Sequence, residues 1–235
     1  MERRSLYLPF FIVFLLNVMV IAPATADQIS WTEEKIGKLA VKADNAATRK
    51  KWARAIKYGE EMLAASEAFH GTNAFYTISR LKTLNRYYDK AGRLGEIHVR
   101  VKNAYQLSKK HFRPIHETAK TSRLLYYKSL LSQENYKGVI PLVLENISIL
   151  RKTKDDDFRR LHYLGQLHGL YGMTGQSIQQ EKILHRQLSL NKHLIGEHLE
   201  DNIKIIMNLA KNYCVQKKVD EFKELIQIYD LKFEC

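Results

Sequence analysis

The segments AGRLGEI (residues 91–97), QENYKGV (133–139), GQSIQQE (175–181) and QKKVDEF (216–222) decide the fold, because they superimpose as four turns between helices. The apolar residue after each turn falls at Leu94, Tyr136, Ile178 and Val219, which gives steps of 42, 42 and 41 residues. One further step toward the N-terminus reaches Trp52 in KKWARAI (50–56). A period of this length indicates a solenoid of stacked helical units, which presents an extended surface for binding.

Apolar residues follow helical spacing along nearly the whole chain. After the turn at Tyr136, a stripe of Val139, Val143, Ile147 and Leu150 continues at steps of three and four residues. No run alternates with a period of two, and no flexible linker interrupts the pattern, so the sequence predicts an all-α chain without a second folded domain. The expected antiparallel pairs are 31–48 with 50–67, 73–90 with 93–110, 114–132 with 135–152, 156–173 with 176–194, and 199–216 with 218–233.

The N-terminus has the pattern of a secretory signal peptide. A positive start (ERR, residues 2–4) precedes the apolar run LYLPFFIVFLLNVMVIA (6–22), and ATA (24–26) follows as the cleavage site. We therefore expect residues 1–26 to be removed, and residues 27–235 to form one repeat domain that is periplasmic or secreted. An uncleaved membrane anchor is the alternative interpretation of the same segment.

The formal net charge of +13 favours acidic partners or polyanionic surfaces. Cations interleaved with 13 tyrosines also suit nucleic acid. Many of these tyrosines fall at core positions of the repeat, however, and the chain carries an export signal. Nucleic acid is therefore not an expected partner.

Cys214 and Cys235 are the two cysteines of the sequence. Two cysteines in an exported chain suggest a disulfide. The predicted repeat opposes this bridge, because about 15 helical residues would place the two cysteines about 20 Å apart, well beyond the limit of ~7 Å between bridged Cα atoms. An intermolecular pair through Cys235 stays open, as does self-association through the last repeat, which ends in LKFEC without a capping helix.

A short pattern recurs in the first helix of several pairs: NLAKNY (208–213), LNRYY (84–88) and LHGLY (167–171), each followed by a turn. With FRPIHETA (112–119) and IGEH (195–198) between pairs, this pattern resembles tetratricopeptide-repeat (TPR) proteins, in particular the 42-residue repeats typified by kinesin light chain. The resemblance implies a right-handed superhelix of antiparallel helix pairs. It also implies protein–protein interaction, with the partner lying in a concave groove formed by the first helix of each pair.

The groove positions that the resemblance implies carry mostly cationic side chains. Mapped from the tyrosines of the pattern, these positions are Lys82, Arg86, Lys90, Lys128, His162, Lys204 and Lys211. Such a groove resembles the carboxylate-clamp grooves of some TPR proteins, in which charge-assisted hydrogen bonds hold carboxylates. Lysines that only solvate the helix surfaces are the alternative interpretation.

The sequence contains no pattern that predicts catalysis, a metal or a cofactor. The pairs His162/His168 and His193/His198 are six and five residues apart, so neither pair has the four-residue spacing of helical zinc ligands. A nucleophile elbow and a phosphate-binding loop are also missing from the sequence. We therefore expect a non-enzymatic scaffold that binds an acidic protein or peptide. A protein that binds polyanions or an envelope surface through its overall charge is the first alternative, and an enzyme with an unrecognised site is the second.

Overall fold

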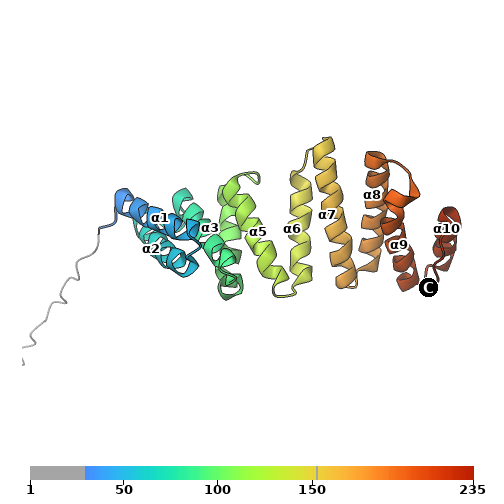
Figure 1. Ribbon diagram of the computed structural model, residues 1–235, viewed down its shortest axis with the longest axis horizontal. Coiled ribbons are helices and arrows are strands. Elements are labelled where there is room, and N and C mark those ends of the chain that lie inside the picture. Colours follow the sequence, from blue (N-terminus) through green and yellow to red (C-terminus); the bar gives the residue numbers. More distant parts are fainter. Residues whose placement is uncertain (1–29, 152) are drawn as a thin grey trace, which may run out of the picture. The chain divides into compact units, whose positions relative to one another are not determined.

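The computed structural model describes residues 30–151 and 153–235, and the chain divides into a unit of residues 1–30 and a compact unit of residues 31–235. The expected signal peptide, residues 1–26, lies outside the described residues. In the described part of the second unit, ten α-helices and one 3-10 turn follow one another without a β-strand (Figure 1). The predicted all-α repeat solenoid is confirmed.

The helices form five successive pairs. These are α1 (Glu33–Thr48) with α2 (Trp52–His70), α3 (Phe75–Lys90) with α4 (His98–His111), α5 (Glu117–Leu131) with α6 (Tyr136–Ile149), α7 (Lys154–Met173) with α8 (Ser177–Ile195), and α9 (Leu199–Gln216) with α10 (Val219–Tyr229). The 3-10 turn η1 (Leu94–Ile97) precedes α4. Every helix contacts the next along the chain, so the pairs stack in sequence order.

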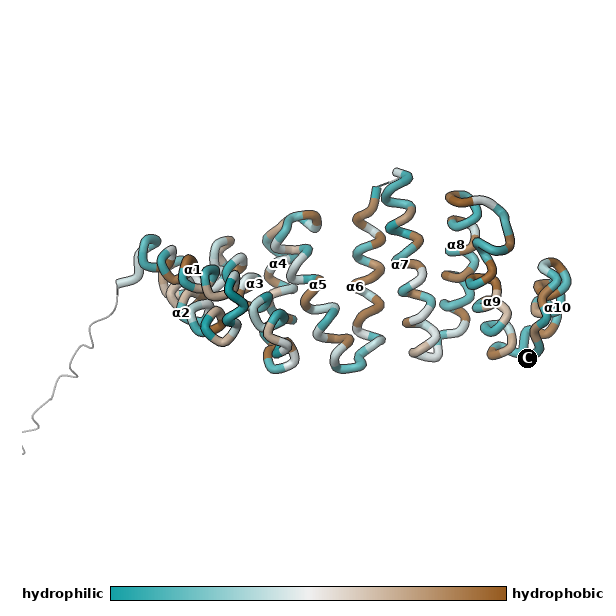
Figure 2. Tube along the Cα trace, viewed as in Figure 1, coloured by the Kyte–Doolittle hydropathy of each residue, from teal (hydrophilic) through white to brown (hydrophobic). Residues whose placement is uncertain are grey.

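Apolar and polar stretches alternate along the helices (Figure 2), as expected for helices that bury one face. The buried faces form several clusters that continue from one pair to the next. Among the described residues, no helix combines the length and apolar character needed to cross a bilayer.

The turn inside each pair repeats one backbone conformation. A residue with positive φ follows the first helix at Lys50, Gly92, Glu134, Gly175 and Lys217, at steps of 42, 42, 41 and 42 residues. The N–H group of the next residue donates to the carbonyl oxygen five positions back, as in a Schellman motif. These bonds join Lys51 to Ala46, Arg93 to Tyr88, Asn135 to Leu130, Gln176 to Tyr171, and Lys218 to Tyr213.

The fourth turn departs by one residue from the predicted register. In this turn the residue with positive φ is Gly175, and helix α8 begins two residues later, at Ser177. The residue predicted at this position, Ile178, is the second residue of α8. The shorter step of 41 residues therefore separates the positive-φ residues Glu134 and Gly175. The turn itself has the same length as the others.

Three of these turns hold residues that tolerate positive φ poorly, because a Cβ atom crowds the backbone there. We expect Glu134→Gly and Lys217→Gly each to raise the free energy of unfolding by up to about 1 kcal/mol, and Gly92→Ala to lower it by about the same amount. Urea denaturation followed by circular dichroism measures these changes. Gly37→Ala is the control, because no neighbour lies within 4 Å of an added Cβ and its φ is not positive. If Gly92→Ala behaves like this control, the turn argument is wrong.

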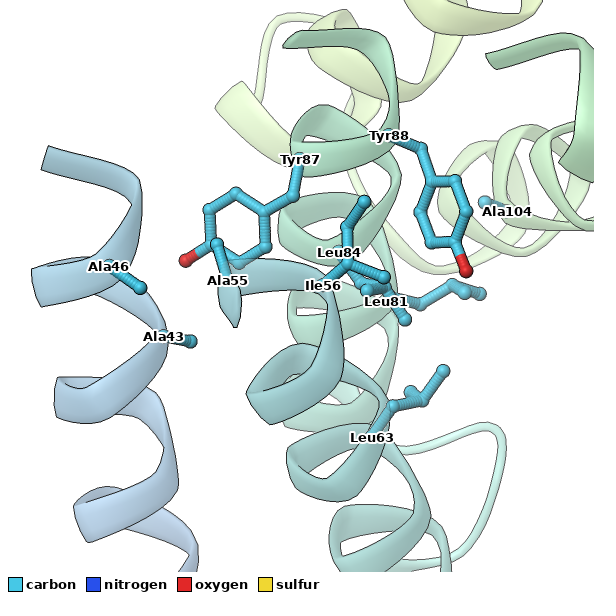
Figure 3. Close-up of a cluster of buried hydrophobic side chains, with 10 residues drawn as sticks. All are labelled: Ala43, Ala46, Ala55, Ile56, Leu63, Leu81, Leu84, Tyr87, Tyr88 and Ala104. Carbon is cyan, nitrogen blue, oxygen red and sulfur yellow. The ribbon is translucent and has the colours of Figure 1, made fainter. Parts of the chain in front are cut away.

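The first core cluster shows how closely neighbouring helices approach. Leu84 of α3 is fully buried against α2, and a Cβ atom added at Gly59 would lie 2.8 Å from Leu84 Cδ1. Figure 3 shows Leu84 between Tyr87 and Tyr88, with Ala43 and Ala46 of α1 beyond Tyr87 in the same core cluster. Small side chains on α2 therefore provide the room that large side chains of α3 fill.

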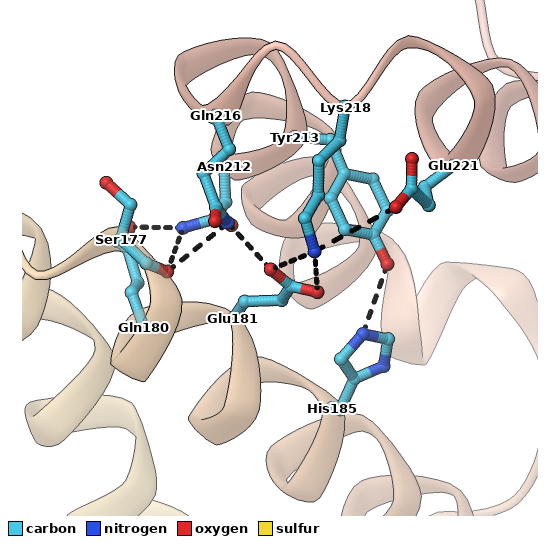
Figure 4. A network of polar contacts seen from close by, with 9 residues as sticks. All are labelled: Ser177, Gln180, Glu181, His185, Asn212, Tyr213, Gln216, Lys218 and Glu221. Atoms are coloured by element: carbon cyan, nitrogen blue, oxygen red, sulfur yellow. Dashed lines mark hydrogen bonds and ion pairs between the residues drawn. The ribbon is translucent and has the colours of Figure 1, made fainter.

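Tyrosine hydroxyls connect one pair to the pair before it. The Tyr88 hydroxyl donates to Glu60 Oε1 at 2.8 Å, and the Tyr213 hydroxyl lies 3.1 Å from His185 Nε2. Both partners lie 28 residues before the tyrosine, so the same contact recurs three repeats later. In the later repeat, Lys218 Nζ also bonds both carboxylate oxygens of Glu181, at 2.8 and 2.9 Å (Figure 4).

The C-terminal segment differs most from the prediction. Helix α10 ends at Tyr229, because Asp230 adopts a left-handed conformation. The sequence pattern predicts an end at residue 233. The chain then turns back, and Cys235 forms a disulfide with Cys214, with the Cα atoms 5.3 Å apart. The expectation that these cysteines are too far apart is therefore wrong. Leu231 and Phe233 pack onto the last core cluster beside this bridge.

Candidate functional site

Cationic side chains gather where α3 and α5 meet. Helix α3 is the first helix of the second pair and α5 is the first helix of the third pair, and the two contact each other directly. Lys82 and Arg86 lie one turn apart on α3, and Lys120 lies in the second turn of α5. All three interact electrostatically with the carboxylate of Glu117. We name Lys82, Arg86 and Lys120 the cation cluster, since three positive charges here surround one negative charge.

The environment of the cation cluster shifts the pKa values of two of these groups. Burial lowers the pKa of Lys82, which is 9% exposed, and the charge of Arg86 lowers it further, against the opposing charge of Glu117. The pKa of Glu117 is lowered by a hydrogen bond from Thr121 and by the three cations. Within the described part of the chain, the ammonium group of Lys82 makes no hydrogen bond or ion pair. An added anionic group would offset the cost of burying this ammonium group.

A hollow of about 870 Å³ adjoins the cation cluster and lies between α5, the end of α6 and α7. Its volume is within the usual range of ligand pockets. Its wall combines charged groups with apolar and aromatic groups. The charged groups include Lys120 and Arg159, the polar groups include His162, and the others include Leu124, Tyr127 and Tyr163.

The acidic residues beside the hollow stabilise the start of α7. Asp156 accepts from the backbone N–H of Arg151 at 3.0 Å and pairs with Arg159 at 3.2 Å. The Thr153 side chain accepts from the Asp156 N–H as the helix cap. The three aspartates at 155–157 lie in the first turn of this helix, where the positive end of the helix dipole stabilises their carboxylates.

The floor of the hollow is fixed by a buried arginine. Arg123 donates to Asn146 Oδ1 at 2.7 Å and to Glu145 Oε1 at 3.0 Å. Tyr105 and Lys109 of α4 also bond Glu145, at 2.5 and 3.0 Å. Burial alone would raise the pKa of Glu145, but these hydrogen bonds and the charges of Lys109 and Arg123 outweigh it, so the pKa is lowered. The network links α4, α5 and α6 and commits the Nε and Nη1 groups of Arg123 to partners within the protein.

The structure separates the seven predicted groove residues into four sets. Lys82 and Arg86 lie together in the cation cluster, and His162 lines the hollow, where its Nε2 atom is 2.9 Å from Gln166 Nε2. Lys128 is committed to an ion pair with Asp89 at 2.8 Å. The remaining three are exposed on their helices away from the hollow: Lys90, Lys204 and Lys211.

Several residues of the site were not predicted from the sequence. Lys120, Leu124 and Tyr127 form a stripe at steps of four and three on α5, and Arg159 and Tyr163 form another on α7. The helical spacing of these residues was a usable signal, since side chains three and four apart share one helix face. The mapping took only one groove position from each of these two helices and therefore missed the hollow between them.

Across residues 30–151 and 153–235, histidine, cysteine, aspartate and glutamate side chains form no group arranged to hold a metal ion. His168 is half-buried, and burial lowers its pKa, which favours the neutral ring. The polar groups of the hollow are suited to binding charged and amphipathic surfaces through hydrogen bonds and ion pairs.

No family model matches the chain, and no curated protein matches it in sequence. Among solved structures, it is similar to the TPR-like repeats of a Podosopora anserina protein designated a kinesin light chain, with a TM-score of 0.54 and 15% identity over 83% of this chain and 93% of that one. It is also similar to the MamA protein, with a TM-score of 0.51 and 13% identity over 84% of this chain and 91% of that one. This chain therefore has the fold of a TPR-like helical repeat protein.

Proposed function

We propose that this chain is a non-enzymatic scaffold that binds an acidic protein or peptide along the first helices of its repeats. The observation that carries the proposal is the cation cluster, in which Lys82, Arg86 and Lys120 face a single carboxylate beside the hollow. Charge-assisted hydrogen bonds from these cations to partner carboxylates would fix the partner's position. The aromatic and aliphatic wall of the hollow would then bury part of the partner's apolar surface.

A stacked repeat favours this role because its binding surface is already organised. The hydrogen-bond networks between pairs hold the first helices in place, so binding does not have to order the receptor. We further propose that the protein is exported to a periplasm or secreted after removal of residues 1–26. The disulfide between Cys214 and Cys235 supports this location, since such bridges persist in oxidising compartments.

The alternative is a protein that binds polyanions or an envelope surface through its overall charge of +13. The two functions differ in which positively charged residues binding depends on. A scaffold depends on the cation cluster, whereas a polyanion binder responds to the total charge and loses affinity steeply with salt.

Affinity capture from a native envelope extract, followed by binding assays with the captured protein, tests the proposal. The groove variant is Lys82→Glu/Arg86→Glu/Lys120→Glu. Its control, Lys57→Glu/Lys137→Glu/Lys223→Glu, changes the net charge equally at exposed positions on second helices. We expect the groove variant to bind at least tenfold more weakly, since each lost charge-assisted bond contributes about 1.5–3 kcal/mol, and the control to bind normally. Equal weakening in both variants would favour the polyanion alternative and contradict the scaffold.

A second copy of the chain is a further proposed partner, at the C-terminal pair. The segment after α10 returns to that pair through Leu231, Phe233 and the disulfide, so association would involve this segment. A molar mass in solution that stays monomeric at every concentration would remove this partner from the proposal.

A further inference from the structure

Positive charge is concentrated around the first turn, between α1 and α2. Residues 42–57 contain six lysine and arginine side chains and a single acidic residue, Asp44. The carboxylate of Asp44 already accepts a hydrogen bond from the Tyr87 hydroxyl at 2.6 Å. Among the described residues, none of the six cationic side chains has a hydrogen bond or ion pair; they belong to Lys42, Arg49, Lys50, Lys51, Arg54 and Lys57.

Later turns differ, because they hold carboxylates beside their cations. At the second turn Arg93 pairs with Glu96 at 2.7 Å, and at the fifth turn Lys218 pairs with Glu181 at 2.8 Å. Unpaired like charges side by side on a helix repel one another and reduce its stability. The first turn is therefore suited to a ligand that supplies the missing negative charge.

Four of these cations line one recess of about 210 Å³, which we name the turn recess. Lys42 and Arg49 line it from α1, and Lys51 and Arg54 line it from the start of α2. Asn45 lies between the two cations of α1 at steps of three and four residues, so the three side chains share one helix face. Helix α2 adds to the positive potential, because it starts without a side-chain cap or an acidic residue in its first turn.

The size and chemistry of the turn recess suit a phosphate group. Its apolar wall consists of Ala46 and the ring of Tyr58, over which Lys42 Nζ lies at 5.7 Å, so it offers little surface to the apolar side chains of a peptide. Its volume is also below the range of about 300–1,000 Å³ that is usual for organic ligands. Arginine guanidinium groups match the geometry of phosphate with paired hydrogen bonds, and lysine adds further donors.

From this arrangement we infer that the turn recess binds a soluble chain of consecutive phosphate groups. Arg49 and Arg54 hold one phosphate in the recess, and Lys50, exposed next to Lys51, meets the following phosphate outside it. The recess shares α1 with the surface proposed for the protein partner, but it shares no residue with the cation cluster or the hollow. Phosphate binding is therefore a second function, and either proposal can fail without the other.

Calorimetric titration of the purified chain with tripolyphosphate tests the inference. We expect one site per chain, and orthophosphate should bind about tenfold more weakly or worse, because it engages the recess alone. Arg49→Gln/Arg54→Gln should weaken the binding of tripolyphosphate by about tenfold or more, through the loss of charge-assisted hydrogen bonds. The matched control, Arg113→Gln/Arg186→Gln, removes the same charge from two exposed arginines whose side chains have no partner among the described residues, and it should bind nearly as well as the native chain.

A second pair of variants keeps the test valid if the arginine substitutions disturb folding. Lys42→Gln/Lys51→Gln should also weaken the binding of tripolyphosphate by about tenfold, whereas Lys137→Gln/Lys182→Gln, at exposed positions of α6 and α8, should not. Circular dichroism and urea denaturation establish that each variant is folded.

The remaining comparisons separate this site from the groove and from other polyanions. Lys82→Gln/Arg86→Gln in the cation cluster should bind tripolyphosphate nearly as well as the native chain. Equal weakening in the recess and control variants would overturn the inference, as would orthophosphate binding as tightly as tripolyphosphate. If a heparin oligosaccharide displaces bound tripolyphosphate at a lower concentration than free tripolyphosphate does, the recess binds a sulfated polymer and the inference is wrong.

Discussion

Replacing Cys214 and Cys235 with serine is expected to lower the free energy of unfolding of the last helix pair by about 3 kcal/mol, the value for a closed loop of about 20 residues. The bridge spans 21 positions and holds the segment after α10 against α9. In a solenoid each repeat is stabilised mainly by its neighbours, so the loss should be concentrated at the C-terminal end. Amide hydrogen exchange should therefore become about a hundredfold faster in α10, while the protection of α3 should stay unchanged.

Two comparisons isolate the disulfide from the effect of the serines. The native chain treated with a reductant should reproduce the exchange rates of the double variant. Val215→Ser changes an exposed neighbour of Cys214 and leaves the bridge intact, so it should have little effect. If reduction leaves the exchange of α10 unchanged, the bridge does not stabilise this pair.

Leu84→Ala is expected to lower the free energy of unfolding by about 3 kcal/mol, because it removes a fully buried side chain and leaves a cavity between α2 and α3. Gly59→Ala alone should also destabilise, by about 1–2 kcal/mol, since its Cβ would lie 2.8 Å from Leu84 Cδ1. In the Leu84→Ala background the same methyl group enters the cavity. There, Gly59→Ala should stabilise by about 1 kcal/mol, the gain from replacing glycine within a helix.

Urea denaturation of the two single variants and the double variant measures this reversal of sign as a coupling energy. Gly37→Ala provides the control, because its Cβ meets no neighbour within 4 Å and its effect should be the same in both backgrounds. Additive behaviour of Gly59→Ala and Leu84→Ala would contradict the close approach of α2 and α3 at Gly59.

The repeat architecture could be predicted because the turn signals recur with the period of the fold. Glycine marks the turns at Gly92 and Gly175, and the period located the turn at Lys217 without a glycine. The register of the fourth turn was missed because apolar Ile178 stands directly after Ser177, so the pattern of apolar residues pointed one residue too far. The end of α10 was missed because Asp230 is neither glycine nor proline, and the disulfide was missed as a consequence.

The candidate site was predicted only where local spacing determines it. Lys82 and Arg86 lie one turn apart on one helix, so their proximity follows from the sequence. The partner of Lys128 could not be predicted in this way, because Asp89 belongs to the preceding pair and lies 39 residues earlier. The hollow depends on the space left between two first helices, which helical spacing alone does not give.

The recurring positive-φ residues have a consequence for how such a chain can change in length. A cassette that runs from Gly92 to Glu134 begins and ends in the same backbone conformation, with the same hydrogen bond across each boundary. Duplicating or deleting one whole cassette therefore preserves both junctions, whereas an insertion of a few residues within a helix would shift every contact beyond it. The proposed binding surface can therefore be lengthened in modules of one helix pair, while the disulfide-linked end remains as it is.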